Sequence, residues 1–288
     1  MSVSTPVPTS VDDTETFESV LLEEFMADKS ENTKKSYRRF RNKLTQLLGK
    51  PISQTSQAKI IEASNEEKNL NTKQALLNIG ILIRKLSDDL STLELENQRE
   101  KNKQALKAHV KATNTELRGS GLPSYQDLQD YLEYLHGDRM WREYIINYLL
   151  LTFYTRNEDL NLQIVPFKRD MDLSNNFLWV ERSGKKVVYR RSNYKTANKY
   201  GMKEHTISDK KFVEAVKALK EQGRPLIPNP DQVGYYVKQA TLDKVGEGAY
   251  VKIVLDHHKT DFNKIREISQ RRGTSLATLS ESYNLNIE

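Results

Sequence analysis

The chain has 288 residues, of which 29% are charged and 37% are hydrophobic, and its formal net charge is +6. This length is enough for two domains of ordinary size, and the basic balance favours polyanions such as nucleic acid as partners. The absence of cysteine excludes disulfides, thiolate metal ligands and cysteine nucleophiles. This absence also fits an intracellular protein. No apolar run approaches the ~20 residues of a membrane span, so we expect no membrane contact.

The N-terminal part predicts a short arm followed by a helical domain. Residues 1–19 are polar, acidic and rich in Pro, Ser and Thr, which favours a disordered arm. Residues 20–117 are expected to form the helical domain. Its helices are expected over residues 17–28, from a cap at Ser30 or Asn32 to Leu48, over 55–63, over 71–90 and from Thr92 onward.

The second of these helices has an apolar and a basic face. Tyr37, Phe40, Leu44 and Leu48 recur at helical spacing and should face the core. The other face carries Lys34, Lys35, Arg38, Arg39, Arg41 and Lys43. Such a face suits contacts with the phosphates of a nucleic acid, although an ordinary solvated face has the same pattern.

Two glycines and a proline within residues 118–123 predict the boundary of a second domain, residues 122–288. It should begin with two helices, of which the second (residues 140–154) is apolar nearly all round and therefore belongs in the core. Three strands follow, over 175–182, 187–196 and 202–208, and then helices over 209–223, 230–245 and from Ala249 to the end, with a break at Gly273. The predicted fold class is mainly α with a small antiparallel β-sheet (α+β).

An arginine, Arg156, directly follows the apolar helix, and Asp159 lies three positions later. A guanidinium beside a core helix needs a partner, and this spacing lets the carboxylate supply it. An ordinary arginine at a helix start would give the same local pattern.

Two further segments carry chemistry. Tyr194-Lys195-Thr196 lies in the strand region, in a basic loop that also contains Lys199 and Lys203. Near the C-terminus, Arg272-Gly273-Thr274 leads to Tyr283, which follows the glycine by ten positions. A tyrosine hydroxyl has a pKa near 10, so as a nucleophile it needs cations around its target and a proton acceptor.

Together these three segments resemble the tyrosine recombinase (phage integrase-like) family. The resemblance implies that Tyr283 is the nucleophile, that Arg156 grips the scissile phosphate and that Asp159 braces the arginine. It also implies that Lys195 protonates the leaving 5′-oxygen, with Lys199 and Lys203 as fallbacks.

The resemblance further implies a second arginine and two histidines. Counting back 31 positions from Tyr283 places Lys252 at the arginine position, and Ala249 and Thr274 fall at the histidine positions. Lysine supplies only a point charge to a phosphate. A different register uses Arg266, and His257 and His258 are then available to replace the missing histidine.

The resemblance implies a DNA recombinase or integrase of viral or mobile-element type that acts in the nucleus or at the site of replication of its element. It would cut and rejoin strands through a 3′-phosphotyrosine, without metal or nucleotide cofactor. The helical domain would clamp double-stranded DNA. The expected DNA contacts are Lys34, Lys35, Arg38, Arg41 and Lys199.

The assembly on DNA would be a tetramer, with a monomer possible in solution. Two alternatives stay open at this point. One is a catalytically inactive relative that binds or packages DNA, and the other is an unrelated helical nucleic-acid-binding protein. The replaced arginine and histidines favour the inactive relative, whereas Arg156, Lys195 and Tyr283 favour the enzyme.

Overall fold

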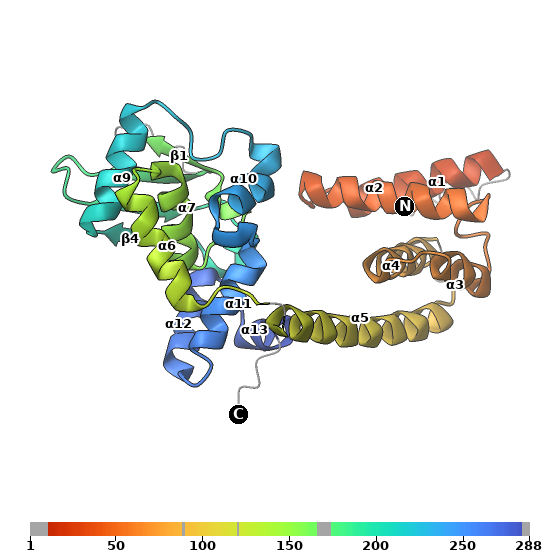
Figure 1. The fold of residues 1–288 in the computed structure, drawn as a ribbon. Helices are drawn as coiled ribbons and strands as arrows, with labels where there is room; N and C mark the ends of the chain where they lie inside the picture. Colours follow the sequence, from red (N-terminus) through yellow and green to blue (C-terminus); the bar gives the residue numbers. More distant parts are fainter. Residues whose placement is uncertain (1–10, 88–89, 120, 166–173, 284–288) are drawn as a thin grey trace. The chain divides into compact units, whose positions relative to one another are not determined.

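The computed structural model describes residues 11–87, 90–119, 121–165 and 174–283. The chain divides into two compact units, residues 1–112 and 113–288 (Figure 1). The division falls earlier than the boundary expected at 118–123, within one continuous helix, α5 (Leu93–Gly119). The glycine- and proline-containing segment thus follows this helix.

The described part of the first unit is helical, as the apolar periodicity predicts. Its other helices are α1 (Val11–Phe25), α2 (Glu31–Leu48), α3 (Gln57–Asn65) and α4 (Leu70–Leu86). Ser30 begins α2 by accepting a hydrogen bond from the Thr33 amide, and Gly49 ends it with φ +65°. Leu44 and Ile60 are fully buried in the shared core.

Helix α1 begins at Val11, inside the segment that the sequence predicts as an arm; residues 1–10 lie outside the described part of the chain. The reason is visible at Glu18, which is fully buried. Its carboxylate accepts hydrogen bonds from the Ser53 amide (2.6 Å) and the Ile52 amide (3.3 Å). Glu18, whose charge favours a solvated arm in the sequence, therefore attaches the first helix to residues 52–53.

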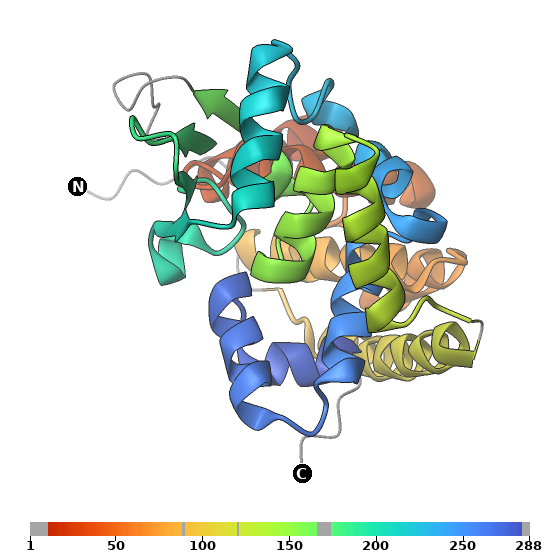
Figure 2. The ribbon, with the colours of Figure 1, turned by 60° about the vertical axis from the view of Figure 1, so that its left-hand side comes forward.

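The second unit is built around α7 (Trp141–Phe153), which packs against α6, α9, α10, α11 and α12. This confirms the core position expected for the most apolar helix. The surrounding helices are α6 (Tyr125–Gly137), α8 (Ala197–Tyr200), α9 (Lys210–Glu221), α10 (Val233–Ala240), α11 (Glu247–His257), α12 (Phe262–Arg272) and α13 (Leu276–Tyr283). Short 3₁₀ turns are η1 (Glu158–Leu160), η3 (Pro230–Gln232) and η4 (Leu242–Lys244). Figure 2 shows α12 and α13, in blue, side by side.

The sheet of the second unit has the strand order β1-β2-β3-β4: β1 (Leu162–Val165), β2 (Asn176–Val180), β3 (Val187–Arg191) and β4 (Lys203–Ile207). The three expected strands, β2 to β4, are antiparallel. Strand β1 was not expected and pairs with β2 in parallel, so the sheet is mixed rather than antiparallel. Four residues at a sheet edge leave little periodic signal in a sequence.

The fold class, mainly α with a small sheet, is confirmed. Among the helices that the structure describes, none combines the length and apolar character needed to cross a bilayer.

Candidate functional site

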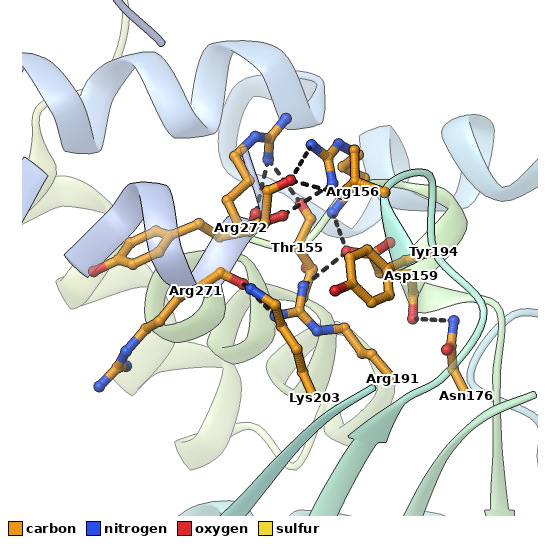
Figure 3. A network of polar contacts seen from close by, with 12 residues as sticks. Thr155, Arg156, Asp159, Asn176, Arg191, Tyr194, Lys203, Arg271 and Arg272 are labelled. Atoms are coloured by element: carbon orange, nitrogen blue, oxygen red, sulfur yellow. Dashed lines mark hydrogen bonds and ion pairs between the residues drawn. The ribbon is translucent and has the colours of Figure 1, made fainter. Parts of the chain in front are cut away.

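A cluster of arginines lies where the end of α7, the ends of the strands and the turn between α12 and α13 meet (Figure 3). Arg156 follows α7 after Tyr154, whose left-handed conformation (φ 54°) turns the chain away from the helix. Its guanidinium donates to the carbonyl oxygens of Arg272 (2.9 Å) and Gly273 (3.5 Å). The first and third motifs of the sequence are therefore in direct contact.

Asp159 contacts the backbone of Arg156, whereas a contact with its guanidinium was expected. One carboxylate oxygen accepts the backbone N–H of Arg156 (3.1 Å). The same oxygen forms an ion pair with Arg191 at the end of β3 (2.9 Å), and both side chains are fully buried. Arg191 also donates to the Arg271 carbonyl. Arg191 was not predicted as a site residue, because local spacing in the sequence gives no signal for a partner 32 positions away.

Gly273 shows why this turn contains glycine. Its φ is +67°, and a Cβ there would lie 3.0 Å from the Tyr194 ring and 3.2 Å from Thr196 Oγ1. Thr196 donates to the Gly273 carbonyl (2.6 Å), and Lys203 Nζ donates to the carbonyls of Gln270 and Arg271. The loop between β3 and β4 is thereby fastened to the end of α12.

Arg272 joins the cluster to Tyr283. It is 6% exposed and donates to the Tyr154 carbonyl (2.7 Å). Its Nη2 forms an ion pair with Glu247, at the start of α11, and lies 3.3 Å from the Tyr283 hydroxyl. The structure thus brings Arg156 and Tyr283 together through an arginine that the sequence analysis did not select. Its one sequence signal is its place directly before Gly273.

Burial and mutual repulsion shape the charges of this cluster. Burial, and then the neighbouring Arg272, lower the pKa of Arg156, which as a guanidinium stays protonated. Burial raises the pKa of Tyr283, whereas Arg272 and Arg156 act in the opposite direction. The pKa of Lys203 falls to about 8 because of burial, and next because of Arg191 and Arg156. Lys203 therefore loses its proton more readily than an ordinary lysine.

The other lysines of this loop are exposed. Lys195 directly precedes Thr196, which is bound to Gly273, and its side chain reaches solvent. Lys199 is also exposed and lies over the Tyr200 ring (5.5 Å). Both are accessible to an anionic partner.

The other predicted site residues differ in their surroundings. Lys252 is 1% exposed within α11, and Thr274, directly after Gly273, is 9% exposed with its amide bonded to the Ser269 carbonyl (3.0 Å). His257 and His258 contact the Tyr125 ring at the end of α11 opposite to Glu247. Arg266 is exposed on α12. The burial and location of these residues depend on tertiary packing, which intervals in the sequence do not reveal.

The basic face of α2 is largely engaged within the first unit. Arg38 pairs with Glu23 (2.6 Å) and Lys34 with Glu31 (2.9 Å). Arg41 is 8% exposed and donates to the Ser19 hydroxyl (2.6 Å). Besides Arg38, the exposed cations on this helix are Lys35 and Arg39, the latter stacked over Phe40.

Polar atoms without a partner surround the arginine cluster. Within the described residues, Thr155 Oγ1, Asn157 Oδ1 and Asp159 Oδ1 are buried and lack a hydrogen bond. Buried polar atoms are normally satisfied, and exceptions gather at functional sites. Among the described residues, no group of three His, Asp or Glu side chains is arranged to hold a metal ion.

The similarity of this chain to known proteins lies among solved structures. No protein-family model matches the sequence, and no curated protein matches it. Among solved structures, the chain is similar to a crystal structure of XerA recombinase at 16% identity, with a TM-score of 0.36 and coverage of 95% of this chain and 94% of that chain.

Proposed function

We propose that this protein cuts and rejoins DNA strands by the tyrosine recombinase reaction, with Tyr283 as the nucleophile. The observation that supports this most strongly is the contact between the Tyr283 hydroxyl and Arg272 Nη2 (3.3 Å), within a cluster that also contains Arg156. The guanidinium groups of such a cluster would stabilise an anionic phosphate placed beside the tyrosine hydroxyl.

The phosphate of a DNA strand would bind between Arg156 and Arg272. A guanidinium has five N–H donors, and Arg156 gives two contacts to the carbonyls of Arg272 and Gly273. It therefore keeps donors for a phosphate oxygen. Arg272 would transfer to the phosphate the N–H that it gives to the Tyr283 hydroxyl in the free protein.

In the reaction, the oxygen of Tyr283 attacks phosphorus, and the bond from phosphorus to the 5′-oxygen breaks. A 3′-phosphotyrosine and a free 5′-hydroxyl result, and the reverse attack rejoins a strand. The phosphodiester energy is kept in the protein–DNA bond. Each direction moves one proton off the nucleophile and one onto the leaving oxygen.

Glu247 is our proposed acceptor for the tyrosine proton, because it shares Arg272 Nη2 with Tyr283. Lys203 is our proposed donor to the 5′-oxygen, because its pKa of about 8 suits proton transfer near neutral pH. Lys195, exposed on the same loop, is the alternative donor.

A second candidate is a protein that binds DNA without cutting it. The position of His257 and His258 favours it. They contact the Tyr125 ring at the end of α11 opposite to Glu247, although they were the residues expected to replace a histidine of the site. In this case DNA phosphates would be bound by Arg156, Lys195 and Lys199. Tyr283 would pack against the hydrophobic core without attacking DNA.

The test is covalent capture on a pool of nicked duplexes with random sequence beside the nick, so that the target site need not be known. When Tyr283 attacks a phosphodiester a few nucleotides from the nick, the short 5′-hydroxyl fragment between that bond and the nick diffuses away, and the protein stays attached to DNA under denaturing conditions. We expect adducts with the native chain and none with Tyr283→Phe. Arg272→Ala should reduce the yield about 10²-fold or more.

A matched control is Tyr235→Phe, which removes an exposed hydroxyl on α10. It should leave the yield unchanged. Binding of the pool without any adduct, by both the native chain and Tyr283→Phe, would support the second candidate and contradict the first.

A further inference from the structure

A second basic feature of residues 113–288 is a pocket of about 850 Å³ between α9, the turn that joins β2 to β3 and the start of α7. Trp141, Val213 and four lysines contribute to its lining: Lys185, Lys186, Lys210 and Lys217. This volume lies in the range of pockets that hold a ligand.

The pocket is separate from the arginine cluster. Strand β2 begins at Asn176, whose side chain donates to the Asn193 carbonyl beside the cluster (2.7 Å), and it ends at Val180. The turn that lines the pocket follows that end. Five strand residues span about 17 Å, so the two features lie at opposite ends of the strand.

Positive charge is concentrated at this pocket. Lys185 and Lys186 are exposed on the turn, and Lys217 Nζ lies 3.0 Å from the position of a Cβ on Gly184. In the described part of the chain, no ion pair engages any of the four lysines. Two carboxylates, Glu214 and Glu221, also line the pocket, and Glu214 is bound to His136 (3.2 Å). The four lysines outnumber these two carboxylates, and the excess of positive charge favours an anionic partner.

The pocket also has an apolar part. Trp141 is 9% exposed and Val213 is 6% exposed, and Ala218 lies beside them. Phosphates gain nothing from such a surface, whereas an apolar side chain does. A DNA duplex is convex and stiff, so its backbone suits an open basic face better than a concave pocket with an apolar floor.

We propose that this pocket binds an acidic peptide segment of a partner protein, with one apolar side chain on Trp141 and flanking carboxylates on the four lysines. A tryptophan in a pocket with a charged rim is a common anchor of protein interfaces. The proposal does not depend on the function proposed for Tyr283.

The test uses Trp141 as the reporter. The chain has two tryptophans, so Trp179→Phe in the full chain leaves one signal. The probe is a synthetic peptide, DDEFDED, and its emission change is titrated at about 0.15 M salt. We expect saturable binding that the peptide DDESDED does not reproduce.

Charge variants then locate the binding. Lys185→Gln combined with Lys217→Gln should weaken binding roughly five- to tenfold. The matched control, Lys220→Gln, changes a lysine of α9 outside the pocket lining and should leave the affinity unchanged. The proposal would be overturned by an equal loss of peptide affinity in the double variant and in Lys220→Gln, or by equal binding of the two peptides. It would also be overturned if duplex DNA, but not DDEFDED, saturated the change in Trp141 emission.

Discussion

Lys203 is the residue of the candidate site that links its charge to solution pH. Its pKa is about 8, below the ordinary 10.5, because of burial and then of Arg191 and Arg156. Between these two pH values the folded chain has released a proton that the unfolded chain still holds. Stability contributed by this group therefore rises as pH increases from about 8 to about 10.5.

We predict that the native chain gains unfolding free energy relative to Lys203→Met when the pH is raised from about 7 to about 9.5. Urea unfolding of both chains at the two pH values measures this. Lys220→Met, which changes a lysine of α9, should follow the native chain. An identical pH response of the native chain and Lys203→Met would show that Lys203 titrates normally.

Some residues of the candidate site could be predicted from the sequence and others could not. Arg156 and Tyr283 were identified from intervals, and the structure brings them together through Arg272. Neither Arg272 nor Arg191 could be selected, because their partners, Glu247 and Asp159, lie 25 and 32 positions away. Lys252, predicted at the position of a second arginine, is 1% exposed within α11, and its interval to Tyr283 gives no signal of this burial.

At the scale of elements, the turn between α12 and α13 positions the site. Gly273 ends α12 with φ +67° and receives Tyr194 and Thr196 at close range. The ten-residue interval from Gly273 to Tyr283 is visible in the sequence. The close contacts that require a glycine at position 273 are visible only in the structure. Most helices and β2 to β4 followed from periodicity, whereas α8 lies in an expected loop and β1 depends on a tertiary pairing with β2.

We predict that Gly273→Ala destabilises the protein by more than the ~1–2 kcal/mol of a left-handed alanine, because the methyl group also meets the Tyr194 ring at 3.0 Å. Gly223→Ala is a matched control, since Gly223 has φ +63° and nothing within 4 Å of a Cβ. Urea denaturation gives both free energies. Equal losses would contradict the close packing of this turn.

At the scale of the whole molecule, each of the two units offers cations to a polyanion. In the first unit Arg38 and Arg41 are engaged internally, so Lys35 and Arg39 are the cations of α2 that we expect to reach DNA phosphates. The sequence showed the basic face but not which of its members are paired.

We predict that Lys35→Gln with Arg39→Gln weakens DNA binding and reduces the slope of log K against log salt by about 1.8, or about 0.9 for each phosphate contact. Fluorescence anisotropy with a labelled duplex over a range of salt concentrations measures the slope. Lys59→Gln on α3, an exposed lysine of the same unit, should leave it unchanged. An unaltered slope in the double variant would place the DNA contacts elsewhere.

If Tyr283 forms the bond to DNA, the modified residue can be identified directly. Trypsin should release Tyr283 in a peptide, residues 273–288, of which it is the single tyrosine. Mass spectrometry of nuclease-trimmed adducts from the nicked-duplex reaction then identifies the modified residue. We predict a nucleotide 3′-phosphate on Tyr283. A nucleotide on any other residue, or an adduct that persists in Tyr283→Phe, would contradict the claim.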